Sequence, residues 1–256
     1  MIFSKDKNQK KELQKKIDLA DSYLNSPHHS AGIKATLFEE AKRPFRTDII
    51  NFTIQSLNRE TTYLEIGVRE PDDNFNKISS EKKYSVDPGY ENAENNVDFK
   101  MTSDAFFNNL RKGNVLESSI KFDVIFIDGL HLADQVERDI NNALEFLEED
   151  GYIIMHDCNP PTEYHASEDF SYKLSPAGYT WNGTTWKAFF KARKREDLYS
   201  CCVDTDWGVG VLSKSKSIGT PSKVSNEFYE YKVLEAKREE SLNLVSFEQF
   251  QKLVTV

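Results

Sequence analysis

Two aspartates, each at the end of an apolar run, are the residues whose type and spacing point most directly to chemistry. Asp128 ends the run FDVIFID, and Asp157 follows GYIIMH. If both runs are neighbouring strands of one sheet, their backbones lie about 4.8 Å apart. Two carboxylates that close repel each other unless one is protonated or a cation lies between them. The pair therefore indicates either a hard divalent ion such as Mg²⁺ or two acids that each cap the following turn.

A histidine three residues after Asp128 is the candidate proton acceptor. The His131 imidazole titrates near neutrality, so it can remove a proton from a substrate hydroxyl. His131 stands at the entry to a predicted helix and should face the same cleft as the two aspartates. We expect His156 to point to the other side of its strand. The remaining histidines are expected in solvated loops: His28, His29 and His165.

A second set of residues follows the earlier apolar runs. Glu65 and Gly67 lie near the end of the first run, Asp87 just past the second, and Ser103 with Asp104 just past the third. An acid at the Asp87 position is suited to accept hydrogen bonds from ribose hydroxyls, and a glycine lets the backbone approach a ligand without a Cβ clash. Singly, each residue could instead cap a helix or form a turn. Their occurrence at successive strand ends favours a ligand site.

The segment WNGTTWK, residues 181–187, opens a predicted helix and contains two candidate substrate contacts, Trp186 and Lys187. Lys187 and the preceding loop are expected near the cleft, where they could meet a sugar or a phosphate. The structural alternative places Trp186 in the core with Phe189 and Phe190.

The stretch from Phe122 to Asp157 must position the aspartates and the histidine. Its first run is rich in β-branched and aromatic residues without polar alternation, which is typical of a strand covered on both faces. Apolar residues then recur at helical spacing over 132–147, and Gly151 stands where a C-terminal glycine is expected. The run 152–155 returns to strand. A strand–helix–strand unit of this length is a right-handed crossover between parallel strands, and ligands bind at the carboxyl ends of such strands.

Shorter patterns predict the remaining elements of an α/β, Rossmann-like, doubly wound and mostly parallel sheet with one antiparallel edge strand. Further strands are expected over 62–68, 83–86, 97–101 and, as a hairpin, 198–203 and 207–212. Helices are expected over 10–24, from Thr47 to Leu57, over 185–195 and 228–237, and after the capping box Ser246–Gln249. We divide the chain into an N-terminal helical extension (1–60), a Rossmann-like domain (61–214) with a loop insertion (160–183), and a C-terminal helical tail (215–256).

Composition excludes several classes of protein. With 256 residues and a net charge of −9, the chain lacks the basic balance of an electrostatic nucleic-acid binder. No apolar run approaches the ~20 residues of a membrane helix, and the lysine-rich first residues do not form a signal peptide. Three cysteines match neither a disulfide framework nor a zinc site. We expect a reduced, cytoplasmic protein that acts on a small molecule, with a homo-oligomer left open.

These motifs, taken together over roughly residues 62–212, resemble those of class I S-adenosylmethionine-dependent methyltransferases. The resemblance is closest to bacterial methyltransferases found with polysaccharide and sugar-modifying enzymes. The motifs that carry it, in order and spacing, are LEIGV (64–68), YSVDPG (84–89), MTSDAFF (101–107), FDVIFIDGLH (122–131), GYIIMHDCNPPTE (151–163) and WNGTTWKAF (181–189).

The resemblance implies a seven-stranded sheet with S-adenosylmethionine over the ends of the first three strands. Glu65 and Gly67 would line its methionine part, Asp87 would hold the ribose, and Asp104 would lie by the adenine. Ser103 and Asp128 complete the expected cofactor contacts.

The resemblance also implies a metal-assisted reaction. Acids at the Asp128 and Asp157 positions would bind Mg²⁺, and His131 would act as the base. The chemistry would be in-line transfer of a methyl group from the sulfonium to the hydroxyl of a sugar or another small molecule.

The first loop departs from the family pattern. It reads Glu65-Ile-Gly67-Val-Arg69-Glu70-Pro71, without the usual second and third glycines, so Arg69 and Pro71 are expected to narrow the methionine end. Other interpretations are a non-catalytic protein of the same fold that binds a nucleotide or a partner, and a metal-dependent hydrolase that uses Asp128 and Asp157. A nicotinamide-dependent oxidoreductase ranks low, because no G-x-G-x-x-G follows the first strand.

Overall fold

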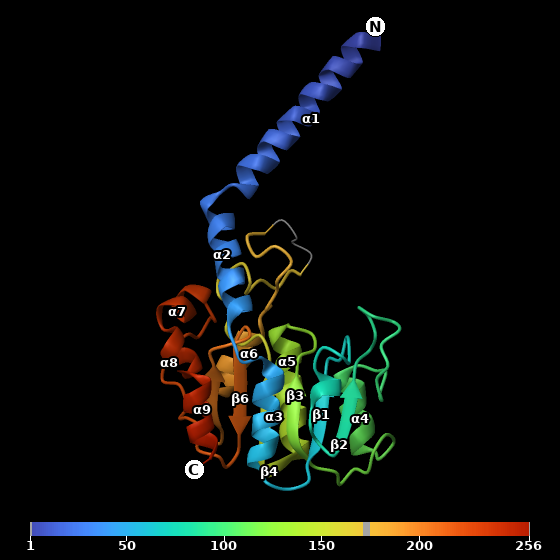
Figure 1. Ribbon diagram of the computed structural model, residues 1–256, viewed down its shortest axis with the longest axis vertical. Coiled ribbons are helices and arrows are strands. Elements are labelled where there is room, and N and C mark those ends of the chain that lie inside the picture. The colour runs from blue at the N-terminus through green and yellow to red at the C-terminus, as the bar shows by residue number, and fades with distance from the viewer. Residues whose placement is uncertain (1, 171–174, 256) are drawn as a thin grey trace.

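A seven-stranded sheet forms the centre of the computed structural model, which describes residues 2–170 and 175–255 (Figure 1). The strand order is β2-β1-β3-β4-β6-β5-β7. The strands are β1 (Thr62–Ile66), β2 (Lys82–Val86), β3 (Phe122–Ile127), β4 (Leu147–Met155), β5 (Tyr199–Val203), β6 (Val209–Ser213) and β7 (Leu244–Val245). Six strands run in one direction, because β6 alone pairs antiparallel with its neighbours β4 and β5. The prediction of a seven-stranded, mostly parallel α/β sheet is confirmed.

The reversed strand lies inside the sheet and not at its edge, so that detail of the prediction is wrong. In the hairpin of β5 and β6, the second strand pairs with β4 and the first strand lies outside it. The edge beyond β5 is then taken by β7, which runs parallel to β5. The predicted strand over 97–101 is reduced to an isolated bridge between Phe99 and Val86, so β2 forms the opposite edge.

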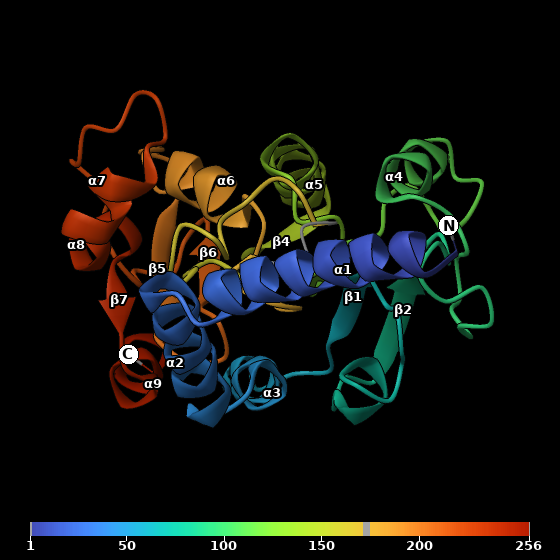
Figure 2. The same cartoon turned by 90° about the horizontal axis from the view of Figure 1, so that it is seen from above.

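Helices cover both faces of the sheet, as a doubly wound fold requires (Figure 2). On one face lie α4 (Ser103–Arg111), α5 (Ala133–Phe146), α6 (Thr185–Ala192), α7 (Tyr231–Ala236) and α8 (Arg238–Leu242), which share one hydrophobic cluster with the sheet. On the other face, α3 (Arg46–Ser56) and α9 (Phe247–Val254) share a second cluster with it. A short 3₁₀ helix, η1 (Phe75–Lys77), joins β1 to β2. The capping box predicted at Ser246 is present, with Gln249 as its partner.

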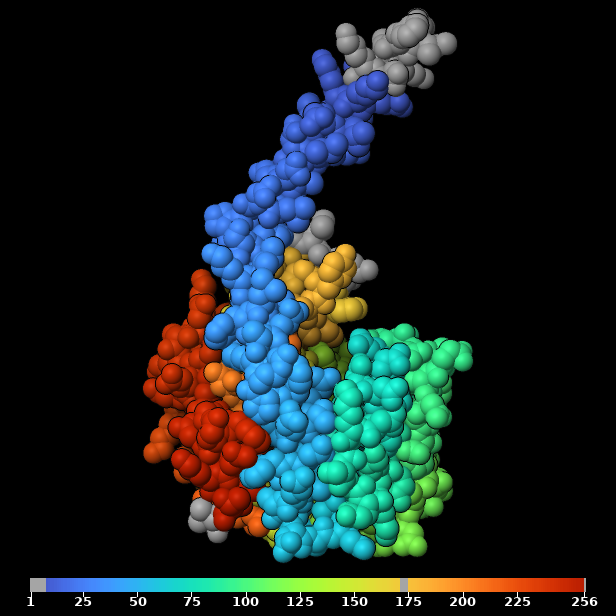
Figure 3. All heavy atoms as spheres, viewed as in Figure 1, coloured from blue at the N-terminus to red at the C-terminus, as the bar shows by residue number. Residues whose placement is uncertain are grey.

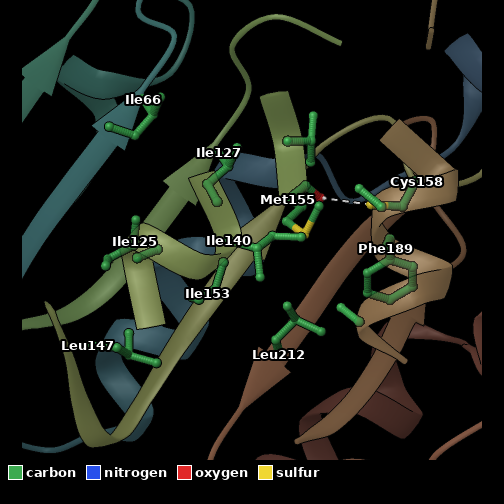
Figure 4. Packing of buried hydrophobic residues seen from close by; sticks show 14 of the residues in the cluster. Ile66, Ile125, Ile127, Ile140, Leu147, Ile153, Met155, Cys158, Phe189 and Leu212 are labelled. Carbon is green, nitrogen blue, oxygen red and sulfur yellow. Dashed lines mark hydrogen bonds between the residues drawn. The ribbon is translucent and has the colours of Figure 1, made fainter. Parts of the chain in front are cut away.

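The predicted crossover is confirmed as β3–α5–β4. The two strands pair in parallel, with Ile125 opposite Ile153 and Ile127 opposite Met155. Ile140 of α5 packs on this pair (Figure 4). Gly151 does not end the helix, because α5 ends at Phe146 and β4 begins at once. A Cβ at Gly151 would lie 2.7 Å from the carbonyl oxygen of Asp123, so this glycine permits close contact between the strands.

Two helices precede the sheet domain: α1 (Ile2–Leu24) and α2 (Pro27–Ala41). The first ends at Leu24 as predicted. The turn at 25–26 then starts a second helix that was not predicted, with Ser26 as its N-cap and Pro27 in its first turn. Figures 1 and 3 show α1 extending away from the rest of the molecule. Over the described part of the chain, none of the helices is both long enough and apolar enough to cross a membrane.

Candidate active site

A cavity of about 540 Å³ lies at the carboxyl ends of β1 to β4. This is the edge at which ligands bind in open α/β sheets. The cavity wall contains most of the predicted site residues: Glu65, Gly67, Asp87, Ser103, Asp128, His131 and Asp157. The sheet therefore gathers side chains that are up to 92 residues apart in sequence, as from Glu65 to Asp157.

His131 lies between the two predicted aspartates. Its Nε2 is 3.2 Å from Oδ1 of Asp128, and its Nδ1 is 3.2 Å from Oδ2 of Asp157. One potential ligand atom from each of these three residues falls within 4.8 Å of the others. The pairing of β3 with β4 brings the two aspartates together, and the short loop after β3 places His131 between them.

His156 belongs to the same cluster, so the prediction that it points away is wrong. Its Nδ1 lies 3.4 Å from Oδ1 of Asp128 and 3.3 Å from Oδ2 of Asp157. The strand ends at Met155, and Asp157 has a φ of 60°, in the left-handed region. Strand alternation therefore no longer decides where the side chains after Met155 point.

Sequence reasoning also missed Arg46 and Asp206, which complete the cluster. Arg46, the first residue of α3, has its Nε 3.7 Å from Oδ2 of Asp128 and its Nη1 3.3 Å from Oδ2 of Asp206. Asp206, in the turn between β5 and β6, also accepts a hydrogen bond from the Arg46 backbone N–H at 2.7 Å. Its Oδ1 is 3.4 Å from Nε2 of His156. Arg46 begins a helix, and Asp206 lies in the hairpin turn after β5, so a search along the ends of the first four strands did not reach them.

The cluster balances its own charges. Burial alone would raise the pKa of Asp128, but His156, His131 and Arg46 outweigh it and hold that pKa well below its usual range. Burial alone would lower the pKa of His131, but Asp157 and Asp128 raise it to about 9. The same two carboxylates raise the pKa of His156 well above its usual value. Without a bound cation, both imidazoles thus hold a proton at neutral pH.

The donor set at this point fits a divalent cation. Asp128 and Asp157 offer carboxylate oxygens, which hard cations such as Mg²⁺ prefer, and His131 is within reach of both. The negative charge of the two carboxylates is at present matched by His131, His156 and Arg46. A cation bound there would take over the role of the two imidazolium charges.

The other end of the cavity holds acids that form no salt bridge with any described basic side chain. Glu65 is 2% exposed and accepts hydrogen bonds from the Tyr63 hydroxyl at 2.6 Å and from Asn74 Nδ2 at 3.0 Å. Burial raises its pKa to about 7. Asp139, which was not predicted, lines the same end, and burial raises its pKa to about 6. Both carboxyls are held by neutral groups and would be stabilised as anions by a cationic ligand.

Asp87 is fixed at the end of β2 by two donors. Its Oδ1 accepts the backbone N–H of Gly89 at 2.6 Å and Nδ2 of Asn95 at 2.9 Å. Asn95 Nδ2 also donates to the Val68 carbonyl at 2.9 Å, so the loops after β1 and β2 are tied together here. The carboxylate is thereby oriented at the cavity wall.

Gly67 is required by packing within the chain. Its φ is 91°, and a Cβ would lie 2.2 Å from the carbonyl oxygen of Asp128. The glycine thus lets the loop after β1 lie against the loop after β3, a reason different from the expected approach of a ligand. Arg69 does line the cavity, but its half-exposed side chain reaches Asp73 at 3.6 Å and Glu91 at 3.7 Å.

The segment 181–184 contacts the cluster of His131 and Asp157. The carbonyl oxygen of Trp181 is 3.2 Å from Nδ1 of His131, and the Trp181 ring stacks on the imidazole with centroids 5.3 Å apart. Asn182 is buried and its Nδ2 donates to Oδ1 of Asp157 at 2.7 Å. Gly183 has a φ of 61°, and a Cβ there would lie 2.1 Å from the His131 carbonyl oxygen. This segment therefore holds both His131 and Asp157.

The same motif contains the two predicted substrate contacts, which lie elsewhere. Trp186 is 1% exposed and belongs to the hydrophobic core, as the structural alternative had it. Lys187 lies 3.3 Å from Glu168 and does not line the cavity. Asp104 is also outside the cavity wall and pairs with Arg138 at 3.3 Å. Two histidines expected in solvated loops, His29 and His165, are buried.

Comparison with known proteins bears on the part of the chain that builds this site. Residues 35–158 match the family model described as a methyltransferase domain. The match identifies a methyltransferase-like segment. It runs from α2 to the end of β4 and covers slightly less than half of the chain.

No curated protein sequence matches the chain. Among solved structures, it is similar to an O-methyltransferase from Bacillus cereus in complex with SAH, with 16% identity, 77% of this chain and 97% of that chain covered, and a TM-score of 0.42. It is also similar to a putative caffeoyl-CoA O-methyltransferase from Staphylococcus aureus, with 14% identity, 79% and 98% covered, and a TM-score of 0.41. The fold of the chain is established by its own strand order, and these distant likenesses add no argument about the site.

Proposed function

We propose that this protein transfers a methyl group from S-adenosylmethionine to a hydroxyl group of a small molecule. The observation that carries the proposal is that a single cavity of the methyltransferase domain contains both kinds of site residue. At one end, Glu65, Asp87 and Asp139 lack cationic partners. At the other end, His131 lies between Asp128 and Asp157.

The acidic end suits the cofactor. S-adenosylmethionine carries a sulfonium and an ammonium group, and a cation stabilises a buried carboxylate. Asp87, held by Gly89 and Asn95, is oriented to accept the ribose hydroxyls. Glu65 would face the ammonium group. Ser103 and Asp139 replace Asp104 as the side chains nearest the adenine, because both line the cavity.

His131 is the proposed base. Its Nδ1 faces the Trp181 carbonyl and Asp157, and its Nε2 faces Oδ1 of Asp128. A cation on Asp128 would draw that carboxylate away from Nε2, which leaves Nε2 to accept the proton of the acceptor hydroxyl while Nδ1 keeps its proton. A divalent cation on Asp128 and Asp157, when bound, supplies charge that lowers the pKa of that hydroxyl and orients it. Occupation of the two carboxylates also removes the interaction that raises the pKa of His131, which frees the imidazole to act as a base.

The wall above His131 gives the acceptor its surroundings. Phe170, Tyr179, Trp181 and Trp207 line this part of the cavity, and the Phe170 and Trp181 rings are 5.2 Å apart. Aromatic faces of this kind suit an acceptor that has one apolar face beside its hydroxyls. A sugar, the acceptor class implied by the sequence resemblance, has this character.

Calorimetric titration of the purified protein with S-adenosylhomocysteine, with and without Mg²⁺, tests the cofactor. We expect saturable binding at one site, weakened by Glu65→Gln. Absence of binding would sink the proposal and favour a non-catalytic protein of this fold. Transfer of a labelled methyl group to a panel of sugars and phenols then tests the acceptor. Chelation with EDTA should abolish transfer and leave S-adenosylhomocysteine binding intact; transfer at an unchanged rate would exclude the metal.

A further inference from the structure

The stripe Leu13, Ile17 and Leu24 of the first helix is exposed, although Tyr23 near the end of this helix contacts His29 of α2. Every described side chain of α1, residues 8–24, is exposed, and the helix extends away from the body (Figures 1 and 3). Helices in proteins gain most of their stability from the packing of an apolar face and little from the backbone alone. A 23-residue helix in this position therefore calls for a surface that covers it.

Four apolar residues of α1 form one narrow stripe. Leu13, Ile17, Ala20 and Leu24 are spaced by four, three and four residues, which is the spacing of the seam between two paired helices. Leu13, Ile17 and Leu24 are 59%, 44% and 48% exposed. A helix that lies on a membrane or on a globular core shows a wider apolar face. The narrow stripe fits a second helix.

The charges of α1 divide along its length. Residues 8–17 carry four lysines, at positions 10, 11, 15 and 16, against one acid, Glu12, and the acids Asp18 and Asp21 follow without a further lysine in the helix. Two copies of α1 in parallel would place lysines against lysines. Two copies in antiparallel orientation place Lys16 of each helix opposite Asp21 of the other, with Lys15 next to this pair, and a two-fold axis makes such an interface self-complementary.

We propose that α1 pairs antiparallel with α1 of a second copy of this chain, so that the protein is a dimer. Leu13 then lies opposite Leu24 of the second copy, and Ile17 opposite Ala20. The two-fold axis passes between positions 18 and 19. This proposal does not depend on methyl transfer.

The second helix extends the interface. A seam of four layers is short compared with the ~800 Å² that each partner buries in a stable complex. In the antiparallel register, the N-terminal part of α1 from one copy runs toward α2 of the other. There α2 presents Ile33, which is 55% exposed and falls opposite position 4 of the other copy. This side chain provides apolar surface that a seam confined to α1 would lack.

Light scattering on the full chain after gel filtration tests the dimer. Leu13→Glu with Ile17→Glu should convert the dimer to a monomer and shift its dissociation constant by at least about a hundredfold. Leu19→Glu is the matched control, since Leu19 is 72% exposed and lies outside the stripe. It should leave the dimer intact. A monomeric wild-type protein, or equal effects of the two variants, would overturn the proposal. Near-ultraviolet circular dichroism shows that the body of each variant is folded.

Cross-linking with a short bis-maleimide tests the orientation. Ala20→Cys lies close to the two-fold axis and should cross-link to itself. Lys10→Cys should not, because its two copies are about 26 Å apart along an antiparallel pair, at 1.5 Å per residue. Cross-linking of both variants would indicate a parallel pair and overturn the antiparallel arrangement. A binding assay with anionic vesicles tests the alternative that α1 binds a membrane. A wild-type protein that is monomeric in solution and binds these vesicles through α1 would overturn the dimer proposal.

Discussion

The two ends of the cavity differ in the groups that contact their buried carboxylates: basic side chains at one end and neutral hydrogen-bond donors at the other. At the end formed by β3 and β4, Asp128, Asp157 and Asp206 are matched by Arg46, His131 and His156. At the end formed by β1 and β2, Glu65 is held by the neutral donors Tyr63 and Asn74. Burial accordingly raises the pKa of Glu65 to about 7, whereas paired cations lower the pKa of Asp206 to about 2.

We expect the two ends to have different functions, because their charges differ. The matched end already contains fixed charges of both signs, so it suits proton transfer and orientation of the acceptor. The unmatched end is poised to gain a cation, so it suits the binding of a cationic cofactor. Variants of the two ends should therefore fail in different assays, one in turnover and the other in binding.

The largest effect is expected from His131→Ala at the matched end. Loss of a general base lowers a rate by about 10²–10⁴-fold. We expect that loss in the turnover number, measured by labelled methyl transfer, with affinity for S-adenosylhomocysteine unchanged within about twofold. Turnover equal to that of the wild type would remove His131 from the mechanism.

Asn182→Ala should have the next largest effect. Asn182 orients Asp157 without lining the cavity, and loss of such a supporting donor typically costs about 10–100-fold in metal affinity or activity. We expect a lower turnover number and a higher Mg²⁺ requirement, together with about 1–3 kcal/mol of lost stability. Asn226→Ala is the control. Asn226 is equally buried but bonds to Glu230, so its loss should lower stability and leave the Mg²⁺ requirement unchanged.

Glu65→Gln should show a pH-dependent effect at the unmatched end. The folded pKa of about 7 lies above the usual 4.5, so the wild type loses stability as pH rises from 4.5 to 7, by about 3 kcal/mol in total. Glutamine does not titrate. The difference in unfolding temperature between variant and wild type should therefore grow in favour of the variant between pH 5 and pH 8, as measured by thermal denaturation in the absence of ligand.

The ligand reverses this trend for the wild type. Ionised Glu65 attracts a cation, so affinity for S-adenosylhomocysteine should rise several-fold from pH 6 to pH 8 in the wild type and stay flat in Glu65→Gln. Parallel titration curves for the two proteins would show that Glu65 does not face the cationic part of the cofactor.

Lys187→Ala should have the smallest effect. Lys187 pairs with Glu168 outside the cavity, and exposed pairs of this kind contribute little. Both turnover and S-adenosylhomocysteine affinity should stay within about twofold of the wild type. A loss of tenfold or more in the Michaelis constant of the acceptor would instead support the substrate contact that the sequence predicts.

The sequence predicted those parts of the fold and site that follow from short-range periodicity. The β3–α5–β4 crossover and the meeting of Asp128 with Asp157 come from apolar patterns and from the geometry of parallel strands. Arg46 and Asp206 were missed because their places depend on how α3 and the β5–β6 turn pack, over a separation of 160 residues. His156 was misplaced because Asp157 leaves the strand geometry on which alternation depends. The division into three segments stays a prediction.

The motif WNGTTWK also shows what residue types alone do not predict. Its composition marked it as important, and its first residues do contact His131 and Asp157. The helix that follows turns Trp186 into the core. Residue type alone could not distinguish the loop that contacts the site from the helix that anchors it.

The packing of Gly67 gives a different explanation for the low glycine content of the loop after β1. Its missing Cβ makes room for the carbonyl oxygen of Asp128, so this position is constrained by the neighbouring strand whether or not a ligand is bound. A substitution at Gly67 would push against the Asp128 backbone and displace the Asp128 side chain from its partners. The one glycine that the loop has kept is thus a spacer between the two ends of the cavity. The loop can vary at Arg69 and Pro71, whereas any side chain at position 67 would disturb the catalytic cluster directly.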